Sequence, residues 1–324
     1  MYHEAGHDMK EQFKVGLDVG LFRSRNDFHM WFGHSYKDAS PAQIDWIFDA
    51  FDRDGDSQLK EPELLTFFEH WVRPLTITRS ALIVVDYQND FINGSLSIDS
   101  GPAKQRAEEA LRPINRLVDS GNFDLVVYTL DWHPENHISF FDNAPLRRIS
   151  SDPSQIRPFA TVQFSEPKIE QTLWPRHCVQ GTNGAELHPN LLVAKNSVKV
   201  YKGTHPDVDS YSAFFDNNKQ FTTNLEASLR AKHITDVYVC GLAYEVCVAA
   251  TAEDALGLGF KTAFLEDCTK GLDDSNMSKA KEKLLQLGAV FANHSQVPKL
   301  LSGYDVPYNW TKFVADKYRK RAST

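Results

Sequence analysis

The chain has 324 residues, of which 42% are hydrophobic and 24% are charged. This length accommodates two domains or one large one, and the composition is ordinary for a globular protein. The net charge of −8 and the absence of an apolar stretch as long as a bilayer span argue against nucleic acid or a membrane as the main partner.

Residues 1–75 contain no strand-like apolar run and are predicted to form a helical module. Apolar residues recur at helical spacing in SPAQIDWIFDAF, where Ser40 is the expected N-cap, and again in PELLTFFEHWV. A degenerate partner motif without ligands is expected in 10–35. The segment 73–80 leads into the second predicted domain, 80–324.

The segment between the two helical patterns, DRDGDSQLKEPE, fits the calcium-binding loop of an EF-hand. Two positions depart from that pattern, because Ser57 stands where glycine is expected and Lys60 stands where an oxygen ligand or a water usually serves. An EF-hand fold that binds calcium weakly or not at all therefore stays open as an alternative. The candidate Ca²⁺ ligands are Asp52, Asp54, Asp56, the backbone carbonyl of Gln58, and Glu63.

From residue 81 onward, short apolar runs alternate with helical patterns. This alternation predicts an α/β fold with a doubly wound, mostly parallel six-stranded sheet and helices on both faces. Residues 142–176 are Pro-rich and are predicted to be an irregular insertion of the kind that shapes active sites. The expected strands are 81–86, 124–132, 197–203, 236–242, 261–267 and 289–293, and the expected helices are 103–119, 219–232, 245 to 257 or 259, and 276–287.

Polar groups follow four of these strands, at the sheet edge where α/β proteins bind ligands. Asp86 ends the first strand, Asp131 and His133 the second, and Lys202 the third, while Cys247 follows the fourth within the first turns of a helix. A thiol attacks as its thiolate, which a helix N-terminus and a nearby ammonium favour. Asp86 is suited to take the thiol proton and return it to a leaving group. Taken singly, the Asp is more often a turn residue and the Cys a packing residue.

A second cluster has the composition of a metal site. Asp131 and His133 are two residues apart on a strand and share a face, and WPRHC supplies His177. One carboxylate and two imidazoles suit Zn²⁺, Mn²⁺ or Fe²⁺. His137 is a further ligand or a group in the second shell. The alternative is a hydrogen-bonded surface turn at DWH.

The motifs VDYQNDF, DWHPENHISF, LWPRHCVQGT, VYKG and GLAYEVCVAATAEDA occur in the order and spacing of the nicotinamidases, within the isochorismatase-like cysteine hydrolases. The chain resembles this family over about residues 80–295. The resemblance implies hydrolysis of nicotinamide to nicotinic acid and ammonia in NAD salvage, through a thioester on Cys247. Asp86 would be the general base and acid, and Lys202 the third member of the triad.

The same resemblance implies the remaining parts of the site. The metal, usually zinc, would bind the pyridine nitrogen and would be held by Asp131, His133 and His177. Backbone N–H groups of Ala243 and Cys247 would form the oxyanion hole, with a cis peptide bond just before Ala243. The aromatic walls of the pocket would be Phe91, Trp174 and Tyr211.

Two other functions are weighed against this one. The first is a related cysteine amidohydrolase that acts on another small amide, which the DWH and WPxHC motifs disfavour. The second is a calcium-binding pseudoenzyme, which the intact Asp86, Lys202 and Cys247 disfavour.

Three further expectations concern the environment of the chain. The four cysteines form no CxxC pair, and no apolar segment follows a basic start at the N-terminus. We therefore expect reduced thiols and an intracellular, soluble and cytoplasmic protein, with a nuclear location left open. The last residues, ending in DKYRKRAST, are expected to form a solvated basic stretch.

Overall fold

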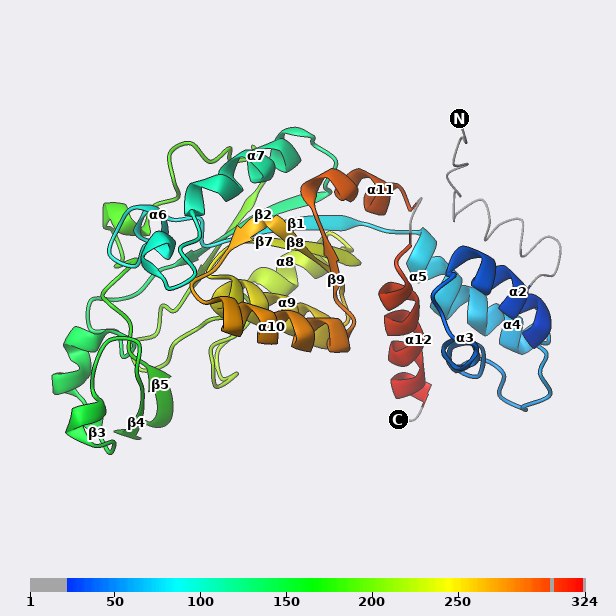
Figure 1. Cartoon of the computed structure of the whole chain (residues 1–324), viewed down its shortest axis with the longest axis horizontal. Coiled ribbons are helices and arrows are strands. Elements are labelled where there is room, and N and C mark those ends of the chain that lie inside the picture. The colour runs from blue at the N-terminus through cyan, green and yellow to red at the C-terminus, as the bar shows by residue number, and fades with distance from the viewer. Residues whose placement is uncertain (1–21, 304–305, 323–324) are drawn as a thin grey trace.

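The computed structural model describes residues 22–303 and 306–322. Figure 1 shows a helical module at one end of an elongated molecule and an α/β domain at the other, with helix α12 (Tyr308–Ala322) between them. No helix among the described residues has the length and apolarity needed to cross a bilayer.

The α/β domain is built on a six-stranded sheet in which every neighbouring pair is parallel, in the order β6-β2-β1-β7-β8-β9. The predicted six-stranded sheet is thereby confirmed, and the predicted strand limits lie within three residues of those observed. The strands are β1 (Ser80–Val85), β2 (Leu125–Asp131), β6 (Val198–Lys202), β7 (Asp236–Leu242), β8 (Lys261–Lys270) and β9 (Val290–Ala292).

Both faces of the central strands are buried, which is why β1, β2 and β7 read as continuous apolar runs. Leu82 and Val84 of β1 join one apolar cluster, and Ala81, Ile83 and Val85 join the other. Helices α7 (Leu111–Asp119), α11 (Val297–Ser302) and α12 supply the first cluster. Helices α8 (Leu225–Ala231), α9 (Ala249–Gly257) and α10 (Asp274–Leu287) supply the second. The short helices elsewhere are α6 (Asn89–Ile92), η2 (Ile98–Ser100), η3 (Ala107–Ala110), η6 (Asn183–Ala185), η7 (Tyr244–Val248) and η8 (His294–Gln296).

The strand order reverses between β1 and β7, which are neighbours in the middle of the sheet. A reversal of this kind opens a crevice at the carboxyl ends of the two strands. Val85 pairs with Gly241 across this junction, and Asp131 pairs directly with Lys202 across β2 and β6. The fold therefore brings the residues after β1 and β7 beside the last residues of β2 and β6.

The insertion 142–176 is more ordered than predicted. It contains a three-stranded antiparallel sheet, β3 (Arg148–Ile149), β4 (Thr161–Glu166) and β5 (Lys168–Thr172), together with η4 (Phe141–Leu146) and η5 (Pro153–Gln155). Val162 and Phe164 alternate with exposed residues along β4 and bury themselves in a small separate core. The prediction of an irregular segment was wrong because TVQFSE carries only two apolar residues, too few to stand out.

The helical module consists of α2 (Arg25–Ser35), α3 (Pro41–Phe48), α4 (Glu61–Phe67), η1 (Phe68–Val72) and α5 (Arg73–Thr76). Ser40 caps α3 as expected, because its hydroxyl accepts a hydrogen bond from the amide of Gln43. The segment 57–59 pairs in antiparallel fashion with 23–25, through Leu59 N to Arg23 O at 2.6 Å. The rest of the expected partner motif, residues 10–21, lies outside the described residues. The segment 73–80, expected to be a connection, is helical up to Thr76.

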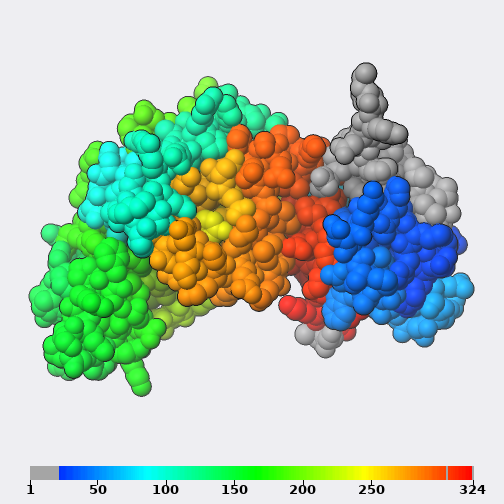
Figure 2. All heavy atoms as spheres, viewed as in Figure 1, coloured from blue at the N-terminus to red at the C-terminus, as the bar shows by residue number. Residues whose placement is uncertain are grey.

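The C-terminal segment is a helix, which was not predicted, and its basic end is exposed at Lys320 and Arg321, as expected. Trp310, Val314 and Tyr318 of α12 recur every four residues and are buried. Trp71 of the helical module donates a hydrogen bond to Thr311 O at 2.9 Å, and Trp310 donates one to Thr262 O of β8 at 3.3 Å. The helix therefore packs against both parts of the chain, and Figure 2 shows this red segment between the blue module and the orange part of the α/β domain.

Candidate active site

Lys202 is the centre of the predicted catalytic cluster. Its Nζ lies 2.8 Å from Asp86 Oδ2 and 3.3 Å from Cys247 Sγ. It also contacts Asp131 Oδ1 and donates to the carbonyl of Ser210 at 3.0 Å. The ammonium and the Asp86 carboxylate are completely buried. The ligand atoms of Asp86, Asp131 and Cys247 lie within 4.8 Å of one another, so the structure brings the predicted triad together.

Two residues that the sequence analysis missed hold this cluster in place. Thr129 of β2 donates a 2.6 Å hydrogen bond to Asp86 Oδ1, and its own carbonyl accepts from the Asp86 amide at 3.2 Å. Gln88 accepts from the amide of Asp131 at 2.9 Å and donates to its carbonyl at 2.7 Å. Both side chains are fully buried. A buried polar side chain one strand away from a candidate catalytic carboxylate is a signal for such a role, but this signal requires knowledge of strand order.

The electrostatics of the site follow from burial and from the buried ammonium of Lys202. Burial raises the pKa of Asp86, against the opposing effect of Lys202, and burial likewise raises the pKa of the Cys247 thiol well above its ordinary value. Burial favours the neutral amine of Lys202, but Asp131 and Asp86 raise its pKa well above the usual range. Burial disfavours the Asp131 carboxylate, yet Lys202 and His133 hold its pKa well below normal. The resting site thus contains an ammonium, an ionised Asp131 and a thiol beside a carboxylate with a raised pKa.

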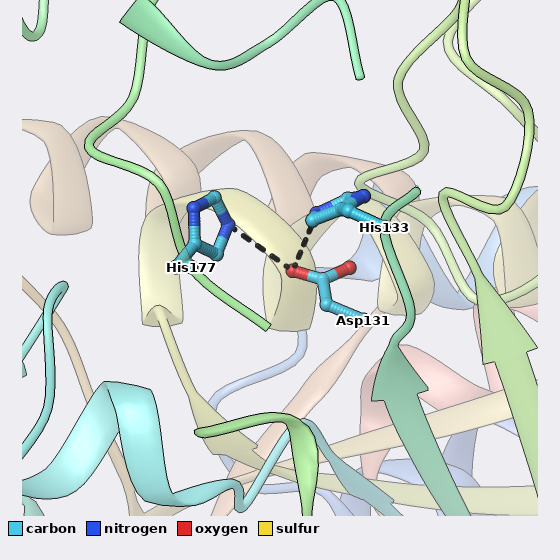
Figure 3. Close-up of side chains that lie close together, drawn as sticks. All are labelled: Asp131, His133 and His177. Carbon is cyan, nitrogen blue, oxygen red and sulfur yellow. Dashed lines mark ion pairs between the residues drawn. The ribbon is translucent and has the colours of Figure 1, made fainter. Parts of the chain in front are cut away.

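The three predicted metal ligands converge. In Figure 3 the imidazoles of His133 and His177 both face one oxygen of Asp131. Asp131 Oδ2 lies 3.6 Å from His133 Nε2 and 3.7 Å from His177 Nε2. Two ligands bound tetrahedrally at about 2.1 Å from one ion are about 3.4 Å apart, so the spacing suits Zn²⁺.

The outer nitrogens of the two imidazoles strengthen this fit. His133 Nδ1 lies 2.9 Å from Gly203 O, and His177 Nδ1 lies 2.7 Å from Pro175 O. A carbonyl only accepts, so each Nδ1 carries the proton and each Nε2 presents its lone pair to the cluster, as metal-ligating histidines do. Burial lowers the pKa of His133, but Asp131 outweighs it and raises that pKa.

The ring of His137 lies against the ring of His133. The two rings stack at 4.1 Å with an interplanar angle of 27°. Both ring nitrogens of His137 have partners, Ser139 Oγ at 2.7 Å and Val208 O at 3.3 Å. Burial and the neighbouring histidines lower the pKa of His137 well below its usual value. A ligand atom of His137 also lies within 4.8 Å of those of His133 and Asp209, so both expected roles, a further ligand or a group that supports His133, remain compatible with its place.

A cavity opens beside Cys247 and the three candidate metal ligands. Phe91, Trp174 and Tyr211, the expected aromatic walls, all line it. Its volume is about 20 Å³, little more than one ordered water needs, so a ring enters only when lining side chains move. Several lining residues could not be predicted from the sequence, because nothing in their local pattern marks a pocket. They are Leu96, Ile98, Asp209, Val246 and Leu272.

Ala243 and Cys247 lie where strand β7 turns into a helix. Ala243 has φ 60° and ψ 63°, in the left-handed region, and η7 begins at the next residue and continues into α9. Cys247 is the fourth residue of this helical segment, where backbone N–H groups lack intrahelical partners. The implied cis bond before Ala243 is not found, because within 22–303 and 306–322 only the Glu166–Pro167 bond is cis. The left-handed Ala243 makes the sharp turn with a trans peptide.

In the candidate calcium loop, Asp52, Asp54 and Glu63 bring ligand atoms within 4.8 Å of one another. Basic side chains already contact these and neighbouring carboxylates. Lys60 Nζ lies 3.4 Å from Asp54 and also contacts Asp56, while Arg25 pairs with Asp52 at 3.0 Å. Ser57 adopts φ 64°, the strained conformation expected where glycine is missing. The backbone N–H of Gln58, another candidate ligand residue, donates a hydrogen bond to Asp56 Oδ1 at 2.9 Å.

Comparison with known proteins places this geometry in a family. Residues 80–296 match the isochorismatase domain. The chain is 39% identical over 209 residues to a nicotinamidase of Acinetobacter baylyi, covering 64% of this chain and 89% of that protein.

Two solved structures are similar over the same region. The yeast nicotinamidase bound to the inhibitor nicotinaldehyde has a TM-score of 0.57 and 34% identity, covering 66% of this chain and 99% of that one. The pyrazinamidase of Pyrococcus horikoshii in complex with zinc has a TM-score of 0.52 and 33% identity, with the same coverage of both chains.

Proposed function

The chain belongs to the isochorismatase family, and on that premise we propose that it is a nicotinamidase, which hydrolyses nicotinamide to nicotinic acid and ammonia in NAD salvage. One observation carries the proposal. The buried ammonium of Lys202 contacts the Cys247 thiol, the Asp86 carboxylate and the Asp131 carboxylate of the metal cluster. The nucleophile and the candidate anchor for the pyridine ring therefore share one small cavity.

The proposed reaction has two stages, formation of a thioester on Cys247 and hydrolysis of that thioester. Asp86, whose raised pKa makes it a stronger base, takes the proton of the Cys247 thiol, and Sγ attacks the carboxamide carbon. The N–H groups of Ala243 and Cys247 are proposed to hold the oxyanion. Asp86 then gives the proton to the departing nitrogen, and ammonia leaves a thioester on Cys247. Water attacks this thioester, Asp86 again accepts the proton and returns it to the thiolate, and nicotinic acid is released.

Lys202 and Thr129 fix the position and the electrostatic surroundings of the Asp86 carboxylate. The ammonium stabilises the thiolate that forms when Asp86 takes the proton, and it remains charged throughout because Asp86 and Asp131 raise its pKa. The hydroxyl of Thr129 fixes one oxygen of Asp86, which leaves Oδ2 on the Lys202 side. These contacts keep the proton acceptor at the thiol instead of in solvent.

Asp131, His133 and His177 are proposed to hold a divalent metal, most simply Zn²⁺, with Mn²⁺ or Fe²⁺ as alternatives. When bound, the metal supplies a Lewis acid for the pyridine nitrogen. The support from this chain is the spacing of the three donor atoms and the carbonyl partners of both Nδ1 atoms. Phe91, Trp174 and Tyr211 are proposed to enclose the ring, and His137 to brace His133.

The test is ammonia release by the purified chain from nicotinamide and from benzamide, which has the same carboxamide on a ring without nitrogen. We expect nicotinamide to be turned over with a kcat/KM at least about 100-fold above that of benzamide, because benzamide leaves the ring anchor without a partner. Equal rates on both amides would favour an amidohydrolase of other specificity. No ammonia from either amide would favour the pseudoenzyme.

We further propose that the helical module, residues 1–75, is EF-hand-like and that its loop 52–63 binds Ca²⁺ weakly. The support is the convergence of Asp52, Asp54 and Glu63. Calcium must displace the Lys60 ammonium and compete with Arg25 for Asp52, which opposes tight binding. Calcium bound here is expected to stabilise the module without driving catalysis.

Calorimetric titration with Ca²⁺ tests this loop. Lys60→Gln should bind Ca²⁺ at least about tenfold more tightly than the unmodified chain, because an ammonium is no longer displaced. Glu63→Gln should abolish binding. Unchanged affinity in both variants, or an activity that falls several-fold with a chelator and returns with calcium, would contradict the proposal.

A further inference from the structure

A large cavity lies where the helical module, α12 and the α/β domain meet. Its volume is about 730 Å³, within the range of sites that hold a ligand of drug or cofactor size. Seven of the side chains that line it are Arg or Lys, and the one carboxylate among them is Glu69. The whole chain carries a net charge of −8, so this local excess of positive charge is opposite in sign to the net charge of the chain.

Carboxylates outside the cavity pair with three of the lining cations. Arg79 pairs with Asp124 at 3.1 Å, and Arg230 pairs with Glu226 at 3.2 Å. Lys261 pairs with the buried Asp236 at 2.9 Å. None of these three acidic residues lines the cavity. The charged side chains that face its interior are therefore mostly positive.

Lys317 of α12 is the cation on which the surrounding positive charge has the clearest effect. Its Nζ donates to the carbonyl of Gly259 at 2.7 Å, and within 22–303 and 306–322 no carboxylate lies in ion-pair contact with it. Burial, together with the nearby cations Arg321, Arg230 and Lys261, lowers the pKa of Lys317 to about 8. Three positive groups around a half-buried ammonium are unfavourable unless an anion offsets them.

The cavity is remote from the active site. Arg79 immediately precedes β1, Thr235 precedes β7 and Lys261 begins β8, so the cavity lies at the amino ends of the strands. Asp86 follows the other end of β1. Six residues of strand at about 3.3 Å each separate the two edges by about 20 Å. The basic cavity therefore takes no part in the hydrolytic chemistry.

The Arg and Lys side chains that line the cavity come from two sides of it. Arg53 and Arg73 belong to the helical module, and Arg230 and Lys317 belong to α8 and α12 on the other side. Arg53 donates to the hydroxyl of Tyr318, and the guanidinium of Arg73 pairs with Glu69 at 2.8 Å. Arginine forks match phosphate oxygens, and one phosphate is too small to engage walls that enclose this volume.

We propose that this cavity is a binding site for a small polyanion that carries two or more linked phosphate groups, which bridges the helical module and the α/β domain. The phosphates occupy the space between Arg73 on one wall and Lys317 and Arg230 on the other. Binding joins the two parts of the chain and relieves the repulsion around Lys317. Because the site is independent of the Cys247 chemistry, the proposal stands or falls separately from the hydrolase activity.

Inorganic tripolyphosphate is the probe, used with the full chain at pH 7 and with NaCl to match ionic strength. Calorimetry should give one tripolyphosphate bound per chain and at least about tenfold weaker binding of orthophosphate. Saturating tripolyphosphate should raise the melting temperature by several degrees, because a ligand of the folded state stabilises it by mass action.

Three variants locate the site. Lys317→Met and Arg73→Gln should each weaken tripolyphosphate binding at least about tenfold, the loss expected for one charge-assisted contact. Arg73 is exposed, so its variant tests the site even if Lys317→Met fails to fold. Lys320→Met, an exposed residue on the same helix and outside the cavity, should bind as the unmodified chain does. Three results would overturn the proposal: no tripolyphosphate binding above the matched NaCl control, binding in both cavity variants as tight as in the unmodified chain, or a loss in Lys320→Met equal to theirs.

Discussion

Replacing Lys202 by methionine tests the electrostatic core of the site. Methionine keeps much of the aliphatic volume but removes the ammonium that lies 2.8 Å from Asp86 and also contacts Asp131. Two buried carboxylates are then left without their cation. Removing one partner of a buried ion pair costs about 3–5 kcal/mol, so we expect the free energy of unfolding at pH 7 to fall by at least about 3 kcal/mol.

The loss of stability in Lys202→Met should depend on pH in a defined direction. Without the ammonium, burial raises the pKa of Asp86 further, and Asp131 loses the main group that lowers its pKa. The folded variant then binds more protons than the unfolded chain above about pH 4, so its stability falls as the pH rises and recovers as the pH drops from 7 toward 5. The unmodified chain behaves oppositely at Asp131, whose low pKa adds stability that is lost on acidification.

Urea denaturation followed by fluorescence measures both effects. With a slope near 3 kcal/mol per molar, a loss of about 3 kcal/mol moves the midpoint down by about 1 M. Lys199→Met is the matched control, because Lys199 is exposed on the same strand and should change stability by less than about 0.5 kcal/mol. The reasoning is refuted if Lys202→Met unfolds within about 1 kcal/mol of Lys199→Met at pH 7, or if their difference does not shrink at pH 5.

Three further predictions address the metal, the base and a remote lysine. His177→Ala should lose bound zinc by metal analysis, while His137→Gln should retain it; equal zinc content in both would be contrary evidence. Thr129→Val should lower kcat about tenfold with little change in KM, because Asp86 loses its 2.6 Å hydrogen bond, and an unaltered kcat would remove Thr129 from the mechanism. Because the folded pKa of Lys317 is about 8, below its unfolded value, melting temperature should rise between pH 8 and 10 more in the unmodified chain than in Lys317→Met; parallel curves would contradict this.

The sheet and the convergence of Asp86, Lys202 and Cys247 could be predicted because both depend on short-range signals. Apolar runs six or seven residues long mark strands buried on both faces, and the residue after each run lies at the carboxyl edge. Asp86 and Cys247 follow the adjacent strands β1 and β7, and Asp131 pairs in register with Lys202. Four polar groups at consecutive strand ends therefore had to meet once the strands were parallel.

The contacts that the sequence did not reveal depend on which strands and helices are neighbours. Thr129 is an ordinary strand residue until β2 lies beside β1 and its hydroxyl reaches Asp86. Asp209 lines the cavity only because the segment after β6 folds back over it. The basic end of the chain is exposed as predicted, but the burial of Trp310 and Tyr318 was not predicted, because it depends on the two parts of the chain that pack against this helix.

The most direct test of the account is ammonia release from nicotinamide by Cys247→Ala, beside Cys240→Ala. Both thiols are buried, but Cys240 lies within β7, where its thiol donates to the carbonyl of Ile83 at 3.7 Å. We predict that Cys247→Ala loses at least about 10³-fold in kcat while keeping its fold and metal content, and that Cys240→Ala stays within about tenfold of the unmodified chain. Near-normal turnover by Cys247→Ala would contradict the proposed nucleophile and with it the whole mechanism.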